Sequence, residues 1–203
     1  MKPGNYNSLS KVYSRYRVGY GKLIIKKIVQ FTKKNEKFIQ AADLGCGTGI
    51  FSRQLKSNRK IKVIGIDPSK EMLREAKKLK KIKIDYRLGK AENTKLKSSS
   101  LDLVTMASSF HWANSKLALK EINRILKKNG ILAILWNPRD IDSSKREKEV
   151  NNLLLRKFGF KNEKSSGNSK SLKDLKKKLQ NSKYFKKIYY FENKHYIKRT
   201  KKD

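Results

Sequence analysis

The chain has 203 residues, of which 37% are hydrophobic, and this suits one globular domain with a sizeable buried core. Its net charge is +35, and its one cysteine, Cys46, excludes an intramolecular disulfide and favours a reducing compartment. No apolar run approaches the about 20 residues of a membrane span, and the opening MKPGNYNSLSK lacks the apolar segment of a signal peptide. We therefore expect a cytoplasmic protein that does not associate with a membrane.

The positive charge is spread along the whole chain. Lys supplies 41 of the 52 basic residues, whereas recognition of phosphates and bases usually depends on the planar fork of Arg. The lysines are interleaved with Asn and Ile, whose codons are AT-rich like those of Lys, so genome composition can explain the bias without a partner. The charge by itself predicts only non-specific, salt-sensitive association with RNA or DNA.

Helix and strand patterns alternate along the first two thirds of the chain. An apolar stripe at helical spacing predicts a helix over 22–34, followed by a strand over 37–44 that leads into a glycine-rich turn. The next elements are expected in this order: helix 49–57, strand 61–67, helix 69–81 opened by Ser69, strand 82–89, strand 100–107, helix 116–130 stopped by Gly130, and strand 131–136, buried on both faces. Such alternation implies right-handed crossovers, and hence an α/β fold with a Rossmann-like, doubly wound, mostly parallel sheet and helices on both faces. Ligands of such sheets bind beyond the carboxyl ends of the strands, where the strand order reverses.

The last third of the chain differs in character, because it is polar and rich in Lys. We expect two helices there, a loop over 164–171, and a strand over 184–192 with the sequence YFKKIYYFE. The chain is accordingly divided into an N-terminal segment (1–36), a core (37–136) and a C-terminal segment (137–203).

The stretch ADLGCGTGIF, residues 42–51, carries glycines at 45, 47 and 49. A glycine-rich turn between a strand and a helix lets the backbone approach a ligand and directs helix N–H groups at it. A phosphate-binding loop would need a Gly-Lys-Ser/Thr ending, which this stretch lacks. A dinucleotide fold would space its glycines G-x-G-x-x-G, but position 50 is Ile.

Two carboxylates complete this pattern. Asp43, two residues before the first glycine, would repel a diphosphate but can hold an ammonium group. Asp67, at the end of the next predicted strand, can accept hydrogen bonds from both hydroxyls of a ribose. These two acids suit S-adenosyl-L-methionine better than NAD. Two other interpretations stay open: Asp43 as a buried residue satisfied by the loop amides, and Asp67 as a cap of the following helix.

The chain resembles the class I S-adenosylmethionine-dependent methyltransferases, in the branch of the methyltransferase type 11 domain. Five motifs occur in the order of that family: ADLGCGTG, VIGIDPSKEML, GKAENTKL, LDLVTMASSFHW and EINRILKKNGILAI. The earlier YSRYRVGY is similar to the opening of the trans-aconitate-methyltransferase-like subgroup, with Val18 where that subgroup has proline.

The resemblance implies a cofactor site for S-adenosyl-L-methionine. In that site the Ala91 amide meets the adenine ring beside Glu92, and the backbone from Ala107 to 109 meets the methionine part. Arg17 would hold the cofactor carboxylate or an acidic substrate. Cys46 fills the turn and is not a nucleophile. The implied cofactor-binding residues are Asp43, Gly45, Cys46, Gly47, Gly49, Asp67, Ala91, Glu92, Ala107 and Arg17.

The residues that would bind the methyl acceptor are implied less directly by the resemblance. His111 could act as a general base, because its pKa near neutrality suits proton removal from an oxygen. The competing interpretation is that His111 and Trp112 only fix the following helix. Tyr13 and Tyr20, with Trp112, would face the substrate from a lid, unless the N-terminal helix is loose.

The resulting hypothesis is direct, metal-free methyl transfer to a small molecule, with a carboxylate or hydroxyl acceptor by analogy to the subgroup. An RNA or protein acceptor, or a non-catalytic cofactor-binding remnant, are the alternatives. Because only NKHYIKRTKKD follows the strand expected over 184–192, we expect the sheet to lack the last, antiparallel strand of the family. The strand over 131–136 would then expose an apolar edge, which a second copy of the chain could cover as a homo-oligomer.

Overall fold

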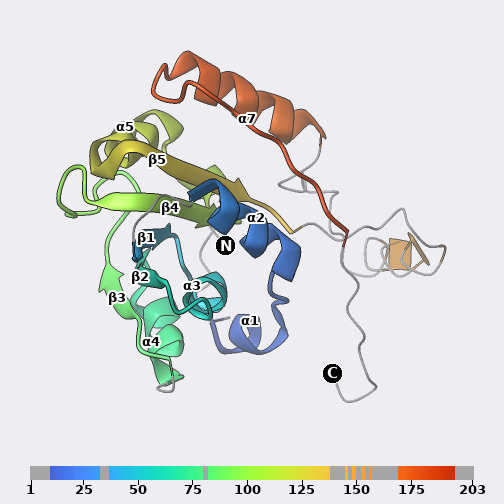
Figure 1. The fold of residues 1–203 in the computed structure, drawn as a ribbon. Helices are drawn as coiled ribbons and strands as arrows, with labels where there is room; N and C mark the ends of the chain where they lie inside the picture. Colours follow the sequence, from blue (N-terminus) through green and yellow to red (C-terminus); the bar gives the residue numbers. More distant parts are fainter. Residues whose placement is uncertain are drawn as a thin grey trace.

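The computed structural model of the chain describes residues 10–32, 37–79, 82–137 and 169–194, with a few positions between 145 and 156. Figure 1 shows a sheet flanked by helices. In chain order the elements are α1 (Ser10–Tyr16), α2 (Lys22–Thr32), β1 (Ile39–Leu44), α3 (Ile50–Lys56), β2 (Ile61–Asp67), α4 (Lys70–Lys78), β3 (Asp85–Leu88), β4 (Leu101–Ala107), the 3-10 helix η2 (Phe110–Trp112), α5 (Ser115–Ile125), β5 (Leu126–Leu135) and α7 (Ser169–Asn181). The elements expected between 22 and 136 therefore occur in the expected order.

The sheet has the strand order β3-β2-β1-β4-β5, and all of its pairings are parallel. This confirms the predicted α/β, Rossmann-like fold class. Within the described residues, the sheet contains no antiparallel strand. The strand order reverses between β1 and β4, so the crevice beyond the carboxyl ends of these two strands is where a ligand is expected. The glycine-rich turn follows β1, and Ser108 follows β4.

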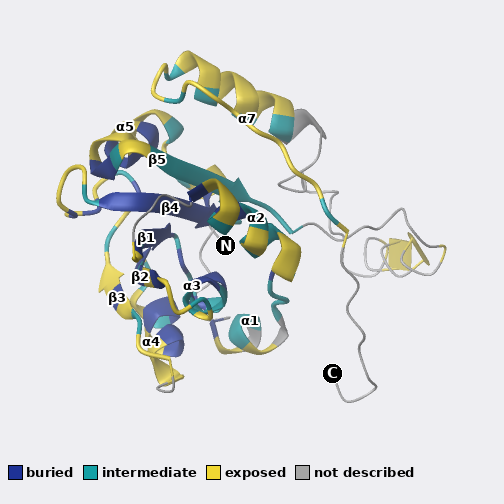
Figure 2. Cartoon of the chain, in the orientation of Figure 1, coloured by how far each residue is buried: buried dark blue, intermediate teal, exposed yellow. Residues whose placement is uncertain are grey.

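Alternate residues of the strands supply a core on each face of the sheet. In β1, Ala41 packs in a cluster with Phe51 of α3 and Ile28 of α2. Its neighbour Ala42 packs in a second cluster with Ile122 of α5. The central strands are accordingly the most deeply buried part of the chain (Figure 2). Among the described residues, no helix is both long and apolar enough to cross a membrane.

The end of α5 differs from the expectation. The helix ends at Ile125, and Leu126 is already extended and pairs with Leu101 of β4, so 126–130 belongs to the strand. The ladder is irregular between Leu101 and Leu103, and Asn129 adopts a left-handed φ of 64°. The predicted helix stop at Gly130 is therefore wrong, because this glycine lies in the irregular stretch of a strand and not at a helix terminus.

The predicted burial of 131–136 on both faces is also wrong. Along β5 the residues from Gly130 onward are only partly buried, because β5 forms the edge of the five-stranded sheet and only β4 pairs with it. Ile131 and Ala133 still pack against the α2 side, and Ile134 against the α5 side. Within the described residues, the edge expected from the sequence is therefore present.

The strand expected over 184–192 is wrong as well, because this segment has no strand structure. After α7 the chain turns back along that helix (Figure 1). Tyr189 stacks on Phe31 of α2, with ring centroids 5.1 Å apart, and the Lys27 amine lies 5.8 Å from the centre of the Phe191 ring. Aromatic contacts with a helix thus replace pairing with the sheet edge. Most of the expected loop over 164–171 lies outside the described residues, although α7 already begins at Ser169.

Candidate cofactor and acceptor site

The glycine-rich turn is fastened to the end of the neighbouring strand β2. The backbone N–H groups of Gly45 and Cys46 both donate to the carbonyl of Ile66, at 2.7 and 3.1 Å. The Gly49 N–H then donates to the Cys46 carbonyl, which closes the turn before α3 begins. The glycines at 45, 47 and 49 have φ angles of 67°, 55° and 76°, a region that residues with a side chain rarely occupy.

The three glycines differ in what an added side chain would contact. A Cβ on Gly45 would lie 2.5 Å from the Cβ of Ser109, and a Cβ on Gly49 would lie 2.2 Å from the hydroxyl oxygen of Tyr86. A Cβ on Gly47 would meet no atom within 4 Å. Packing within the protein therefore accounts for two of the glycines, whereas Gly47 faces open space that a ligand can fill.

Asp43 is fully buried beneath this turn. Its carboxylate accepts hydrogen bonds from Ser52 Oγ of α3 at 2.6 Å and from Thr105 Oγ1 of β4 at 2.9 Å. Burial raises the pKa of Asp43 to about 6, although both hydroxyls oppose the shift. Side-chain hydroxyls, not loop amides, thus satisfy this carboxylate. It joins α3 to β4, and its contact with a cofactor ammonium group stays a prediction.

Asp67 lies at the carboxyl end of β2, facing the turn. Its Oδ2 accepts a hydrogen bond from the Gly47 N–H at 2.7 Å, and its Oδ1 accepts one from the Ser69 N–H at 2.9 Å. Burial raises the pKa of Asp67, and the two amides oppose that shift. Ser69 itself caps α4, since its hydroxyl accepts from the Met72 N–H. Each carboxylate oxygen of Asp67 has a further lone pair, so ribose binding stays a prediction that this geometry permits.

The segment predicted to meet the adenine ring lies between β3 and β4. Glu92 is partly buried, and its carboxylate accepts a hydrogen bond at 2.7 Å from the N–H of Asn114, the residue that caps α5. Ala91 is buried against the α5 side of the core. Lys90 and Asn93 form a bridge around the two. The segment is therefore held in a fixed position relative to α5, and its contact with an adenine ring stays a prediction.

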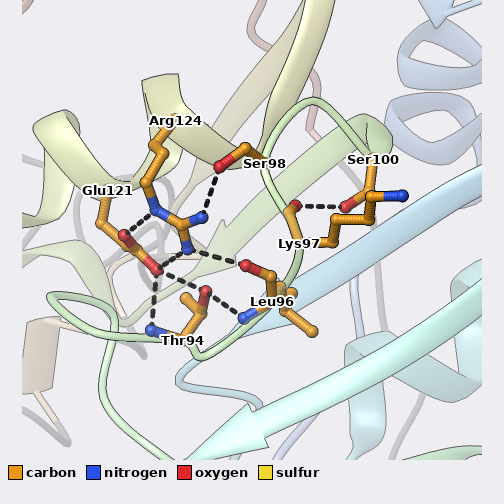
Figure 3. Close-up of polar contacts among 7 residues, drawn as sticks. All are labelled: Thr94, Leu96, Lys97, Ser98, Ser100, Glu121 and Arg124. Atoms are coloured by element: carbon orange, nitrogen blue, oxygen red, sulfur yellow. Dashed lines mark hydrogen bonds and ion pairs between the residues drawn. The ribbon is translucent and has the colours of Figure 1, made fainter.

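An ion pair between the buried Glu121 and the partly exposed Arg124 fixes the chain that follows this segment (Figure 3). Glu121 accepts hydrogen bonds from the N–H and hydroxyl of Thr94, and Arg124 donates to both oxygens of Glu121. Arg124 also donates to the Leu96 carbonyl and to the Ser98 hydroxyl. The spacing of Glu121 and Arg124 on one helix permits their pairing, but the sequence does not indicate their contacts with residues 94–98, which lie up to 28 residues away.

We expect Glu121→Gln to lower stability by about 1–2 kcal/mol at neutral pH, since it weakens charged hydrogen bonds to a partly exposed Arg124. The Arg124 guanidinium lowers the pKa of Glu121 from 4.5 to about 2. A carboxyl group with a lowered pKa stabilises the fold above its unfolded pKa, so this contribution should be lost as pH falls from about 4.5 to about 2. Urea unfolding at pH values from about 4.5 to about 2 measures this loss of stability.

The control Asp85→Asn removes an exposed ion pair with Arg87 and should cost less than about 0.5 kcal/mol. Equal losses of stability for the two variants would contradict the prediction.

The N-terminal segment crosses the carboxyl edge of the sheet and is fastened there. Arg17 donates from Nη2 to the Ser108 hydroxyl at 3.0 Å, and the Tyr20 hydroxyl lies 2.7 Å from the same oxygen. The backbone of Tyr20 exchanges two hydrogen bonds with the Gln54 amide of α3. Asn137 donates to the Gly19 carbonyl. Residues 17–20 are thus held at the carboxyl edge of the sheet, while the placement of Tyr13 and Tyr20 on a lid stays a prediction.

Ser108 is the centre of these contacts, and its backbone has an unusual conformation. Its φ is 54°, and its N–H donates to the carbonyl of Leu135 on β5. Ala107, just before it, still belongs to β4. The sequence indicated that the backbone of 107–109 would contact the cofactor, but it did not indicate the role of the Ser108 hydroxyl. Tyr13 lies nearby, with the Arg17 guanidinium 5.8 Å from its ring centre.

His111 lies in η2 at the mouth of the crevice. Its Nδ1 accepts a hydrogen bond from the indole N–H of Trp136 at 3.4 Å, and its ring lies 4.5 Å from that of Trp112. Burial lowers the pKa of His111, so the ring is mostly neutral at neutral pH. With Nδ1 accepting, the proton of the neutral ring lies on Nε2. The tilted contact with the largely exposed Trp112 is consistent with a packing role for the pair, while the Nε2 atom remains a candidate for substrate contact.

Fold and site together define a Rossmann-like domain whose strand order reverses beside the glycine-rich turn, where a ligand is expected. Residues 42–134 match the family Methyltransf_11, described as a methyltransferase domain. An uncharacterized methyltransferase-like protein of Schizosaccharomyces pombe is 41% identical over 98 residues, which are 48% of this chain and 38% of that protein. A Saccharomyces cerevisiae protein, whose name assigns it to the S-adenosylmethionine-dependent methyltransferases, is 32% identical over 136 residues, covering 64% of this chain and 45% of that protein. The chain thus spans less than half the length of these two relatives.

The fold is similar to that of a crystal structure from Methanococcus maripaludis that is assigned to the S-adenosyl-L-methionine-dependent methyltransferases. The TM-score is 0.60 at 22% identity, and the match covers 88% of this chain and 80% of that one. Residues 42–134 therefore match a methyltransferase domain, and S-adenosyl-L-methionine is the cofactor that the name of the similar Saccharomyces cerevisiae protein gives.

The described residues fit this cofactor. Open space lies in front of Gly47, and the Asp67 carboxylate next to it suits a ribose. The hydroxyl oxygen of Thr48 in the same turn is buried and has no hydrogen-bond partner among the described residues. Such an atom is costly to bury unless a ligand or water satisfies it. Within the described chain, no group of three or more His, Cys, Asp or Glu residues is placed to hold a metal ion.

Proposed function

We propose that the chain methylates an oxygen atom of a small acidic or hydroxylated molecule held between residues 13–20 and the end of β4. S-adenosyl-L-methionine, when bound, supplies a methyl group that its sulfonium has already activated. The side chains of the protein then have to orient the acceptor and exclude water. The proposal agrees with the resemblance to the trans-aconitate-methyltransferase-like subgroup.

The observation that carries the proposal is the set of donors gathered around Ser108. Arg17 brings a positive charge, and the phenol of Tyr20 stays neutral because burial raises its pKa. The neutral ring of His111 adds a donor at Nε2. A carboxylate or hydroxyl can accept from all of these groups, whereas an ammonium group would be repelled by Arg17.

His111 is proposed to donate to the acceptor and not to remove its proton. A base would need a free lone pair on Nε2, and this requires the other tautomer, in which Nδ1–H would point at the Trp136 indole N–H. A carboxylate acceptor is already deprotonated at neutral pH and needs no base. A hydroxyl acceptor would need the ring to give up its contact with Trp136 first.

We expect His111→Ala to lower turnover about 10- to 100-fold while the affinity for S-adenosylhomocysteine changes less than about twofold. Turnover is measured with radiolabelled S-adenosyl-L-methionine and the acceptor found as described below. The control Trp112→Phe keeps an aromatic ring beside His111 and should retain most activity. Turnover unchanged in His111→Ala would leave this residue with a structural role.

The acceptor class can be found with labelled cofactor and a metabolite extract, with and without nuclease or protease. Labelled small methyl esters or methyl ethers are the expected products, and Arg17→Ala should abolish them while S-adenosylhomocysteine still binds. Loss of product after nuclease or protease would instead favour an RNA or protein acceptor. Cofactor binding without any labelled product would favour a non-catalytic remnant.

A further inference from the structure

A run of exposed aromatic side chains follows α7. Tyr189 and Tyr190 are each 67% exposed, and Tyr184 and Phe191 are also exposed. Figure 2 shows the run as a largely exposed segment beside α7. Exposed aromatic side chains in one continuous run are unusual on a protein surface and mark contact sites. The cofactor site makes no use of them.

This run lies against the outer face of α2. Tyr189 stacks on Phe31, which is itself 51% exposed, with an angle of 29° between the ring planes. Lys27 lies over the ring of Phe191. Since Lys27 and Phe31 are four residues apart, they occupy one face of the helix. Two segments far apart in the sequence thus combine aromatic rings and amines on one surface.

The same surface is strongly basic. Along α2 and the segment 183–194 there is a single acidic residue, Glu192, which accepts a hydrogen bond from the Tyr190 hydroxyl. The lysines of these two segments, most of them exposed, are Lys22, Lys26, Lys27, Lys183, Lys186, Lys187 and Lys194. A polyanion is the complementary partner.

We propose that α2 and residues 183–194 form a binding surface for single-stranded nucleic acid, in which lysines contact phosphates and the exposed tyrosine rings stack on bases. Stacking on aromatic side chains with amines along the backbone is the general mode of single-strand binding. A duplex offers its phosphates but keeps its bases stacked inside, so it would leave the rings unused. A membrane surface would favour aromatic rings that point outward, but the Tyr189 ring lies stacked on Phe31.

The test is fluorescence anisotropy of the full-length protein with labelled single strands of uridine or thymidine, with a duplex of equal length, and with anionic lipid vesicles. The single strands should bind tighter than the duplex and the vesicles. Tyr189→Ala combined with Tyr190→Ala should weaken single-strand binding about tenfold or more without changing its salt dependence. The matched control, Tyr189→Phe with Tyr190→Phe, keeps both ring faces and should bind within about twofold of the unmodified protein.

The lysines are tested separately. Lys186→Gln with Lys187→Gln should weaken binding and reduce its salt dependence, whereas Lys70→Gln with Lys77→Gln removes the same charge from exposed positions on α4 and should have a smaller effect. The proposal would be overturned if the two lysine pairs had equal effects, or if Tyr189→Ala combined with Tyr190→Ala bound as tightly as the unmodified protein. Either result would mean that net charge alone accounts for the binding. Tighter binding to vesicles, lost in the alanine variant, would assign the surface to lipid. Preference for the uridine over the thymidine strand would identify RNA as the natural partner.

Discussion

Asp67→Ala is expected to weaken the binding of S-adenosylhomocysteine about 10- to 100-fold, or about 1.5–3 kcal/mol, while the protein still folds. Two contacts are lost together in this variant. The charged acceptor for the ribose disappears, and the Gly47 N–H loses its 2.7 Å partner just where the ligand must approach. Titration calorimetry measures the affinity, and circular dichroism at the same temperature reports the fold.

Two further variants separate these contributions. Asp67→Asn keeps an oxygen that can accept from the Gly47 N–H but removes the charge, so its affinity should fall between those of the aspartate and the alanine. Asp85→Ala removes a carboxylate from the neighbouring strand β3, where its side chain is exposed and pairs with Arg87, and should leave affinity unchanged. Affinity of Asp67→Ala equal to that of the unmodified protein would remove this residue from the site.

The order of strands and helices could be predicted because each element from 22 to 107 carries its own local pattern. The strand 61–67 is found with identical bounds, and Ser69 caps the next helix as its position suggests. The glycine-rich turn and Asp67 could be located for the same reason, since a strand end and a helix start fix where their backbones lie. Local sequence thus located the turn and Asp67 side by side, while their contact with the cofactor stays a prediction.

Contacts between distant residues explain what could not be predicted. The Ser108 hydroxyl gains its role only because Arg17 and Tyr20, about ninety residues earlier, are brought across the sheet edge. The hydrogen bond that Asp43 accepts from Thr105 could likewise not be predicted, because Thr105 lies on a strand 62 residues later in sequence. The aromatic-rich run over 184–192 was expected to form a strand, but its Tyr189 stacks on Phe31 of α2, a contact with a residue more than 150 positions earlier.

Gly45→Val is expected to prevent stable folding, whereas Gly47→Ala should fold and fail to bind the cofactor. A Cβ at 45 would lie 2.5 Å from the Ser109 Cβ, whose hydroxyl donates to the Leu44 carbonyl, and a branched side chain cannot relieve that overlap. The left-handed φ of Gly45 adds about 1–2 kcal/mol of strain for any side chain. Thermal unfolding monitored by circular dichroism should therefore show no cooperative transition for Gly45→Val at ordinary temperature.

Gly47→Ala is the variant that tests ligand approach. A methyl group there meets no atom within 4 Å, so the only cost to folding is the strain of a φ of 55°, about 1–2 kcal/mol. The same methyl group enters the open space beside the turn where the ligand is expected, and affinity for S-adenosylhomocysteine should fall at least about 30-fold, which corresponds to about 2 kcal/mol. Asn129→Ala is the matched control, because it places alanine at a φ of 64° on β5, away from the glycine-rich turn, and should be destabilised without losing affinity. If Gly47→Ala folds and binds as tightly as the unmodified protein, the space in front of Gly47 is not the cofactor site; if Gly45→Val also folds and binds, the glycines of this turn are neither packing nor ligand positions.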